Sequence, residues 1–384
     1  MRRFFLGLAT DFSRKERLSH TFSHATRKDI LKLEEFLSEK YGGTAVATKN
    51  GRSALALALK GLLPIDSKVL VNGFTCYAVV EAVKGAGMEP VFVDISREDL
   101  NFTIQGIKEN LKEGVAGIIV QNTLGNMVDI AEIEKLAKKH NLVIIEDLAH
   151  SAGRKYPDGR EAGMVGAATV LSFGKDKVAS AISGGAVIIR NADEIPSNFG
   201  SRRSLPSPCG SRTPSRAAAL RNPSALMGLS SRIRIRIYPL LGAIARGLSY
   251  VHLGGIFMKI SVRLHLVEKS ADNRLDLTQS IAPIAAKTAL KRLKKVKDRP
   301  IREFYLVNDR EKVLKKLKKN GYYFDGFWYA KPIAPERYYE TVNFPEEKCP
   351  EAVFVAKHII NLPNYYTKSE LKRAREIINE ENGD

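Results

Sequence analysis

Apolar residues fall in short continuous runs along the first half of the chain, and amphipathic segments separate these runs. Residues 78–87 and 130–137 have helical spacing, with apolar side chains recurring every three or four positions. The runs themselves are short and rich in β-branched residues, so we predict strands at 68–71, 90–94, 117–120, 142–145 and 168–173. Short apolar strands that alternate with helices predict an α/β fold with a mostly parallel sheet covered on both faces. Such sheets bind ligands beyond the carboxyl ends of their strands.

The pattern changes at about residue 195. Residues 201–215 are rich in serine, proline, arginine and glycine, which predicts a loop. An apolar run then extends from 237 to 260, and a helical pattern resumes at Thr278. We therefore predict a large domain over residues 1–270, with an insertion at about 195–268, and a smaller C-terminal α/β domain over 271–384.

Positive charge is concentrated in the same insertion. The net charge of the 384 residues is +19, and residues 195–270 contain ten arginines and two lysines against one acid, Glu268. Such an excess suits nucleic acid, an anionic membrane surface or phosphorylated small substrates. No zinc-finger spacing, RNP-like aromatic strand or basic zipper accompanies it, so we expect no nucleic-acid partner.

The apolar part of the insertion has nearly the length of a membrane span, but Arg246, His252 and several glycines interrupt it, which argues against spanning. Two interpretations of residues 232–266 stay open. The segment packs within the chain or against a partner subunit, or it lies as a peripheral element on an anionic membrane surface.

The three cysteines, Cys76, Cys209 and Cys349, fit neither a disulfide framework nor a C-x-x-C metal site. We therefore expect a reducing compartment and no metal. The N-terminus is basic and then apolar, but the apolar run is too short for a secretory signal and Asp11 follows it. These features predict a cytoplasmic protein.

Two segments at predicted element boundaries carry candidate binding groups. Gly51 and Ser53 open a helix whose first N–H groups suit an anion, although an ordinary helix cap has the same pattern. The strand at 142–145 runs into Glu146 and Asp147, with His150 three residues further on. A carboxylate there can keep a pyridine nitrogen protonated, or it can simply cap the next loop.

A third segment carries a candidate nucleophile. Ser172 lies at a predicted strand end, Lys175 and Lys177 follow beyond a turn, and Gly184-Gly185 comes after them. An amine in this place can form an imine with an aldehyde cofactor and later move a proton. For either lysine alone, a solvated side chain is the simpler interpretation.

Together these segments resemble the DegT/DnrJ-type sugar aminotransferases of the aspartate-aminotransferase superfamily, and the resemblance runs nearly end to end. Gly51-Arg52-Ser53-Ala54-Leu55 stands where the family has Gly-Thr-x-Ala-Leu, and Glu146-Asp147-Leu148-Ala149-His150 where it has Glu-Asp-x-Ala-Gln. The family's Ser-Phe-x-x-x-Lys and Gly-Gly match Ser172 to Lys177 and Gly184-Gly185. This register selects Lys177 over Lys175 as the lysine that holds the cofactor.

The resemblance implies a fold-type-I transferase with pyridoxal 5'-phosphate (PLP) as its cofactor and a mixed seven-stranded sheet. It implies that Lys177 is catalytic and that the cofactor is bound by Gly51, Arg52, Ser53, Cys76, Asp147, His150, Ser172 and Lys177. It also implies an amino-acid donor, glutamate in most relatives, and a nucleotide-linked keto sugar as acceptor. A homodimer that serves the synthesis of cell-surface polysaccharide or related amino sugars is the expected setting.

Several positions depart from the family pattern. Arg52 replaces a threonine and either adds charge to phosphate binding or caps the helix; His150 replaces a glutamine near the ring oxygen. Cys76 stands where an aromatic residue usually covers the cofactor ring, and strand alternation should turn the neighbouring Tyr77 away. The family's Asn-x-Arg, which reaches the partner subunit's phosphate, is present only as Asp272-Asn273-Arg274.

Two alternatives to an aminotransferase are a sugar dehydratase of the same fold and a non-catalytic regulatory or scaffold relative. The related dehydratases lack the cofactor lysine, and a scaffold would be marked by loss of the lysine or the aspartate. Lys177 and Asp147 are both present, so we predict the aminotransferase.

Overall fold

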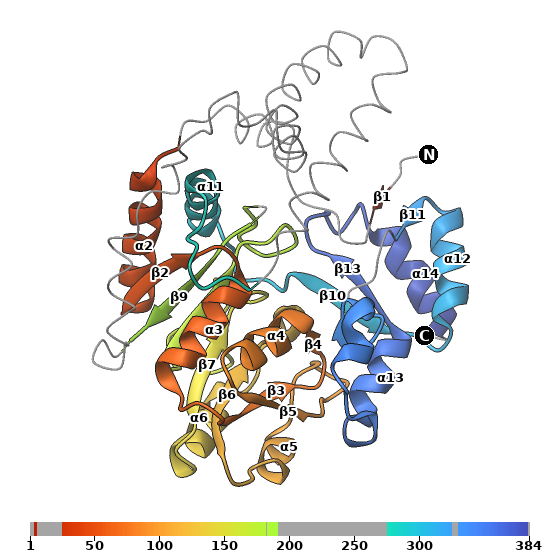
Figure 1. Cartoon of the computed structure of the whole chain (residues 1–384). Helices are drawn as coiled ribbons and strands as arrows, with labels where there is room; N and C mark the ends of the chain where they lie inside the picture. The colour runs from red at the N-terminus through yellow and green to blue at the C-terminus, as the bar shows by residue number, and fades with distance from the viewer. Residues whose placement is uncertain (1–3, 6–24, 182, 191–274, 325–328, 383–384) are drawn as a thin grey trace, which may run out of the picture. The chain divides into compact units, whose positions relative to one another are not determined.

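The computed structural model of the chain describes residues 4–5, 25–181, 183–190, 275–324 and 329–382 (Figure 1). The chain divides into two compact units, Met1–Ile195 with Leu275–Asp384 and Pro196–Arg274, and all of the described residues belong to the first. The predicted insertion at 195–268, the segment 232–266, the predicted domain boundary at 270 and Asp272-Asn273-Arg274 lie outside the described residues. Within the described part, no helix is long and apolar enough to cross a membrane.

Seven strands form the central sheet, in the order β2-β9-β8-β7-β6-β3-β5 (Figure 1). In that order they are Thr44–Thr48, Gly185–Ile189, Ala168–Ser172, Val143–Asp147, Val115–Val120, Lys68–Asn72 and Glu89–Val93. β9 runs antiparallel to both of its neighbours, and every other pairing in the sheet is parallel. This confirms the predicted α/β fold with a mixed, mostly parallel, seven-stranded sheet.

Helices cover the sheet because its strands are apolar on both faces. α2 (Arg27–Tyr41), α6 (Ile130–Lys139) and α11 (Pro283–Leu293) bury their apolar sides in one core with alternate strand residues such as Ile118 and Val120. Ile119, between these two, is equally buried but points to the opposite face. α3 (Gly51–Leu62) packs against β8, β9 and α4 (Tyr77–Gly85). α11 thus belongs to the core of the large sheet although it follows residue 270.

The C-terminal segment builds a second, smaller core. β10 (Arg302–Leu306) pairs antiparallel with β13 (Ile359–Pro363), and α12 (Arg310–Lys319) and α14 (Lys372–Asn382) pack beside them around Leu317, Ile360 and Ile377. The segment also pairs with earlier parts of the chain: β12 (Ile333–Ala334) with β4 (Thr75–Cys76), and β11 (Tyr322–Tyr323) with β1 (Phe4–Phe5). The remaining elements are α5 (Ile104–Glu109), α13 (Pro350–His358), and the 3-10 turns η1 (Thr123–Gly125), η5 (Glu336–Thr341) and η6 (Glu346–Lys348).

Two differences in element boundaries bear on chemistry. β7 extends two residues beyond the predicted strand, so Glu146 and Asp147 lie inside the strand and point to opposite faces of the sheet. α4 ends at Gly85, two residues before the predicted end, and the chain turns at Gly87 with a φ of 81°.

Candidate active site

The predicted site residues gather where the sheet meets the start of α3. Asp147 ends β7, Ser172 ends the neighbouring β8, and the carboxyl ends of parallel strands lie at one edge of a sheet. α3 begins at the same edge, because Asn50 pairs with Gly184 in a bridge and caps the helix by accepting the Ser53 N–H at 2.9 Å.

Gly51 and Ser172 form a narrow cradle. A Cβ added to Gly51 would lie 2.7 Å from Ser172 Cβ and 2.9 Å from Ser172 Oγ, and one added to Gly185 would lie 2.6 Å from Gly51 N. Glycine is therefore required at both positions for the helix start to approach the strand end. The first N–H groups of α3, at the positive end of the helix dipole, and a hydroxyl group converge there, which is an arrangement that binds phosphate.

Arg52 and Ser53 make other contacts. The guanidinium of Arg52 pairs with Glu81 of α4. Ser53 is fully buried, and its Oγ accepts the N–H of Asp276 at 3.1 Å. The structure therefore brings Gly51 and Ser172 together, whereas the side chains of Arg52 and Ser53 are engaged elsewhere.

Two adjacent carboxylates at the end of β7 occupy different environments. Glu146 is fully buried and accepts hydrogen bonds from the Tyr156 hydroxyl at 2.7 Å and from backbone N–H groups of the loop at 163–166. It therefore holds that loop. Asp147 faces the other way and accepts one backbone N–H, from Ala149, at 3.0 Å. Burial raises its pKa, while the Ala149 N–H and the charge of Lys177 act in the opposite direction.

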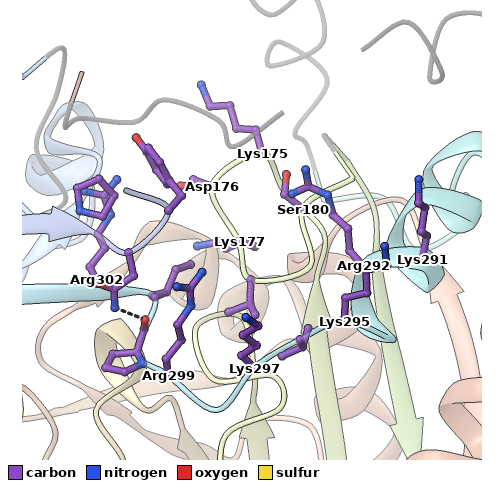
Figure 2. Close-up of a pocket in the computed structure, with 17 residues that line it drawn as sticks. Lys175, Asp176, Lys177, Ser180, Lys291, Arg292, Lys295, Lys297, Arg299 and Arg302 are labelled. Carbon is purple, nitrogen blue, oxygen red and sulfur yellow. Dashed lines mark hydrogen bonds between the residues drawn. The ribbon is translucent and has the colours of Figure 1, made fainter. Parts of the chain in front are cut away.

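Lys177 lies next to His150. Lys177 Nζ is 3.1 Å from His150 Nε2, and His150 Nδ1 accepts the N–H of Leu124 at 3.2 Å. Burial, then the positive charges of Lys177 and Arg302, hold the pKa of His150 well below its ordinary value of 6.5. The ring is therefore neutral at physiological pH. Lys175, two residues away, points away from this group (Figure 2).

Cys76 is half-buried at the end of β4, and its neighbour Tyr77 stacks on Tyr338 with ring centroids 4.3 Å apart. Sequence reasoning missed Tyr329, which is 3% exposed and lies 4.5 Å from the Phe74 ring. Burial, then the charges of Cys76, Asp147 and Asp176, raise the pKa of its hydroxyl group. The charges of Cys76 and Asp147 thus act on Tyr329, whose backbone φ of 67° is rare for a bulky side chain.

A pocket of about 430 Å³ opens at Lys177 (Figure 2). Eight lysine and arginine side chains line it, against one acidic side chain, Asp176. Six of the eight come from the start of the C-terminal segment: Lys291, Arg292, Lys295, Lys297, Arg299 and Arg302. Because α11 is drawn into the core of the large sheet, its charged end and the following loop face the amine of Lys177. The sequence held no signal for this, since the tertiary packing of α11 creates it.

Comparison with known proteins covers the two halves of the chain unequally. Residues 16–200 match the model of the DegT/DnrJ/EryC1/StrS aminotransferase family. A pleiotropic regulatory protein of Geobacillus stearothermophilus is 36% identical over 148 residues, 38% of this chain and 39% of that protein. A GDP-perosamine synthase of Escherichia coli O157:H7 is 31% identical over 175 residues, 45% of this chain and 48% of that protein. The chain thus spans less than half the length of these relatives.

The fold likeness extends over the whole chain. The structure of Helicobacter pylori PseC, an aminotransferase involved in the biosynthesis of pseudoaminic acid, covers 99% of this chain and 100% of its own with a TM-score of 0.64 and 17% identity. At that identity the likeness shows a shared fold, that of the fold-type-I sugar aminotransferases.

Proposed function

Because residues 16–200 match the model of the DegT/DnrJ/EryC1/StrS aminotransferase family, we propose that the chain is a PLP-dependent aminotransferase. Its proposed substrates are an amino-acid donor, glutamate, and a nucleotide-linked keto sugar that accepts the amino group. The observation that carries this proposal is the position of Lys177. Its charge acts on the Asp147 carboxylate, and its side chain lines a pocket together with other lysine and arginine side chains.

The residues present fit PLP. The cradle of Gly51 and Ser172, too narrow for a side chain at position 51, suits the phosphate, and Asp147 suits the pyridine nitrogen. When bound, PLP supplies an electrophilic carbon and an electron-withdrawing ring.

Lys177 and Asp147 would have different roles. Lys177 would hold the cofactor covalently through Nζ and, once released, would take and return a proton at that atom. Asp147, which is buried and accepts the backbone N–H of Ala149, would hold the proton of the ring nitrogen. The charge of the ring nitrogen would in turn compensate for the burial of this carboxylate.

The pocket supports an anionic substrate. Besides Lys177, seven lysine and arginine side chains in one pocket create a positive potential that attracts a diphosphate group. A sugar nucleotide carries such a group, and a dicarboxylate donor such as glutamate also enters a cationic pocket favourably. Synthesis of amino sugars for cell-surface polysaccharide, in the cytoplasm, is the setting that we propose.

A homodimer and peripheral contact with the inner membrane surface belong to the same proposal. The first follows from the resemblance and Asp272-Asn273-Arg274, and the second from the basic, apolar segment 232–266; both segments lie outside the described residues.

A non-catalytic regulatory role is the second candidate, because a regulatory protein is among the similar relatives. Absorbance separates the two. Purified protein that is incubated with PLP and then freed of unbound cofactor should show a band at the edge of the visible range that disappears in Lys177→Ala and stays in Lys175→Ala. Adding glutamate should shift the band, and a panel of nucleotide keto sugars should restore it. A band that persists in Lys177→Ala, or none in the unmodified protein, would contradict the proposal; a band that glutamate and other amino acids leave unchanged would favour the regulatory role.

A further inference from the structure

The imidazole ring of His150 is contacted at both nitrogens. Leu124 N donates to Nδ1 at 3.2 Å, and Nε2 lies 3.1 Å from Lys177 Nζ. A backbone N–H can only donate, so Nδ1 must accept, and the proton of the neutral ring therefore resides on Nε2. The ring thus presents an N–H group, and no lone pair, to the amine of Lys177.

An ammonium group has donors only, so it cannot hydrogen-bond to another N–H. The contact between His150 and Lys177 therefore requires a lone pair on Lys177 Nζ. We propose that His150 is a positioning residue that selects the neutral amine of Lys177 through a ring tautomer set by the backbone N–H of Leu124. The neutral amine is the form of a lysine that attacks a carbonyl carbon. The inference deepens the proposed function, on which its purpose rests.

The loop that carries Leu124 is strained in a way that suits this role. Asn122 and Leu124 have φ values of 52° and 54°, a left-handed conformation that is unfavourable for a residue such as leucine. Buried amides hold the loop in place: Asn101 Oδ1 accepts the N–H of Thr123 at 2.8 Å, and Asn72 Nδ2 donates to Thr123 Oγ1 at 3.0 Å. The strained turn directs the N–H of Leu124 at the ring. Strain that the surroundings maintain in this way is typical of functional sites.

Other ionisable groups surround the amine. Asp147 ends β7, Asp176 lies in the loop that carries Lys177, and Arg302 begins β10, while the charges of Cys76 and both aspartates act on Tyr329. Carboxylates attract an ammonium group, whereas the Nε2–H of His150 can hydrogen-bond only to a neutral amine. His150 is therefore the group that the test removes.

The test uses the full-length protein without cofactor. Trace formaldehyde and cyanoborohydride methylate lysines through the neutral amine, and mass spectrometry follows Lys177 and Lys175 separately from pH 6 to 10. In His150→Leu, methylation of Lys177 near pH 8 should fall about tenfold, the change expected when a titration moves by one pH unit. His150→Gln retains an N–H donor and should restore most of the rate. Lys175 should be unchanged throughout, and His140→Leu, at an exposed histidine, should behave as the unmodified protein.

A Lys177 profile that is the same in His150→Leu and the unmodified protein would overturn the inference. Nitrogen-15 NMR of the unmodified protein gives an independent result that does not require a variant to fold. The histidine signal that disappears in His150→Gln should be neutral with its proton on Nε2, and a proton on Nδ1 would refute the tautomer. Neither measurement uses PLP or a sugar. The inference about His150 can therefore fail or hold independently of whether the protein has the proposed aminotransferase activity.

Discussion

Two regions near Lys177, a buried side and an exposed side, are built on different principles. On the buried side, Asp147 and His150 each accept a backbone N–H, at 3.0 and 3.2 Å. On the other side, Lys295, Lys297 and Arg299 are exposed on a loop. The buried groups are held in fixed positions and can act on one atom of a bound molecule. The exposed lysine and arginine side chains attract any compact anion through their electric field. The two sides should therefore respond to mutation by very different amounts.

The largest effect is expected on the buried side. Asp147→Asn should retain PLP weakly but slow the spectral change that glutamate produces by about 10²–10⁴-fold, because the ring nitrogen loses the group that holds its proton. Stopped-flow absorbance measures this rate. Asp158→Asn, at an exposed turn, is the control. A rate in Asp147→Asn within a factor of two of the control would contradict the proposed role of the Asp147 carboxylate.

A smaller and salt-dependent effect is expected on the exposed side. Replacing Lys295 and Lys297 with glutamine should weaken binding of a nucleoside diphosphate about three- to tenfold at low salt, because each exposed charge contributes little and is screened. Replacing Lys135 and Lys139 of α6, which are also exposed, should have no effect. Calorimetry at two salt concentrations measures both pairs. If both pairs of substitutions weaken nucleoside diphosphate binding equally, the net charge of the protein causes the attraction and the pocket has no special part in it.

The smallest effect concerns stability. Because the folded protein holds the pKa of His150 well below 6.5, the unfolded chain takes up a proton there as the pH falls below 6.5 and the native state does not. Stability should therefore decrease from pH 6.5 downward, by at most about 1.4 kcal/mol for each pH unit from this group. The raised pKa of Asp147 acts in the opposite direction as the pH approaches 3.8.

Urea unfolding of the unmodified protein and of His150→Gln at pH 8, 6 and 5 isolates this contribution. The variant should lose less stability than the unmodified protein between pH 8 and pH 5. Parallel curves for the two proteins would mean that the ring is protonated in the folded state.

Much of the buried side was predictable because its residues are close in sequence. A strand that ends in Asp147, with His150 three residues later, places both groups by local geometry, and the spacing from Ser172 to Lys177 does the same. The exposed side was not predictable, because Lys295 and Lys297 reach Lys177 only after α11 has packed into the core of the large sheet.

Single residues show the same division. The sequence left the role of Arg52 open, and only the structure shows that its guanidinium pairs with Glu81, 29 positions away. Nothing in the sequence distinguishes Leu124, since a backbone N–H has no residue type, and nothing marks Tyr329, whose place depends on the pairing of β12 with β4.

By itself, therefore, the sequence determined the α/β class and the mostly parallel sheet, which follow from periodicity. The mixed seven-stranded sheet and the choice of Lys177 were implied by the family resemblance, which rests on motifs whose members lie within a few residues of one another. The sheet is confirmed, and the role of Lys177 stays a prediction. The tertiary structure alone decided which groups surround that lysine: His150 with the backbone N–H of Leu124, and the lysine and arginine side chains that follow α11. It also decided the partner of Arg52. These depend on contacts between segments far apart in the chain, where burial and charge act through space and local patterns carry no record of them.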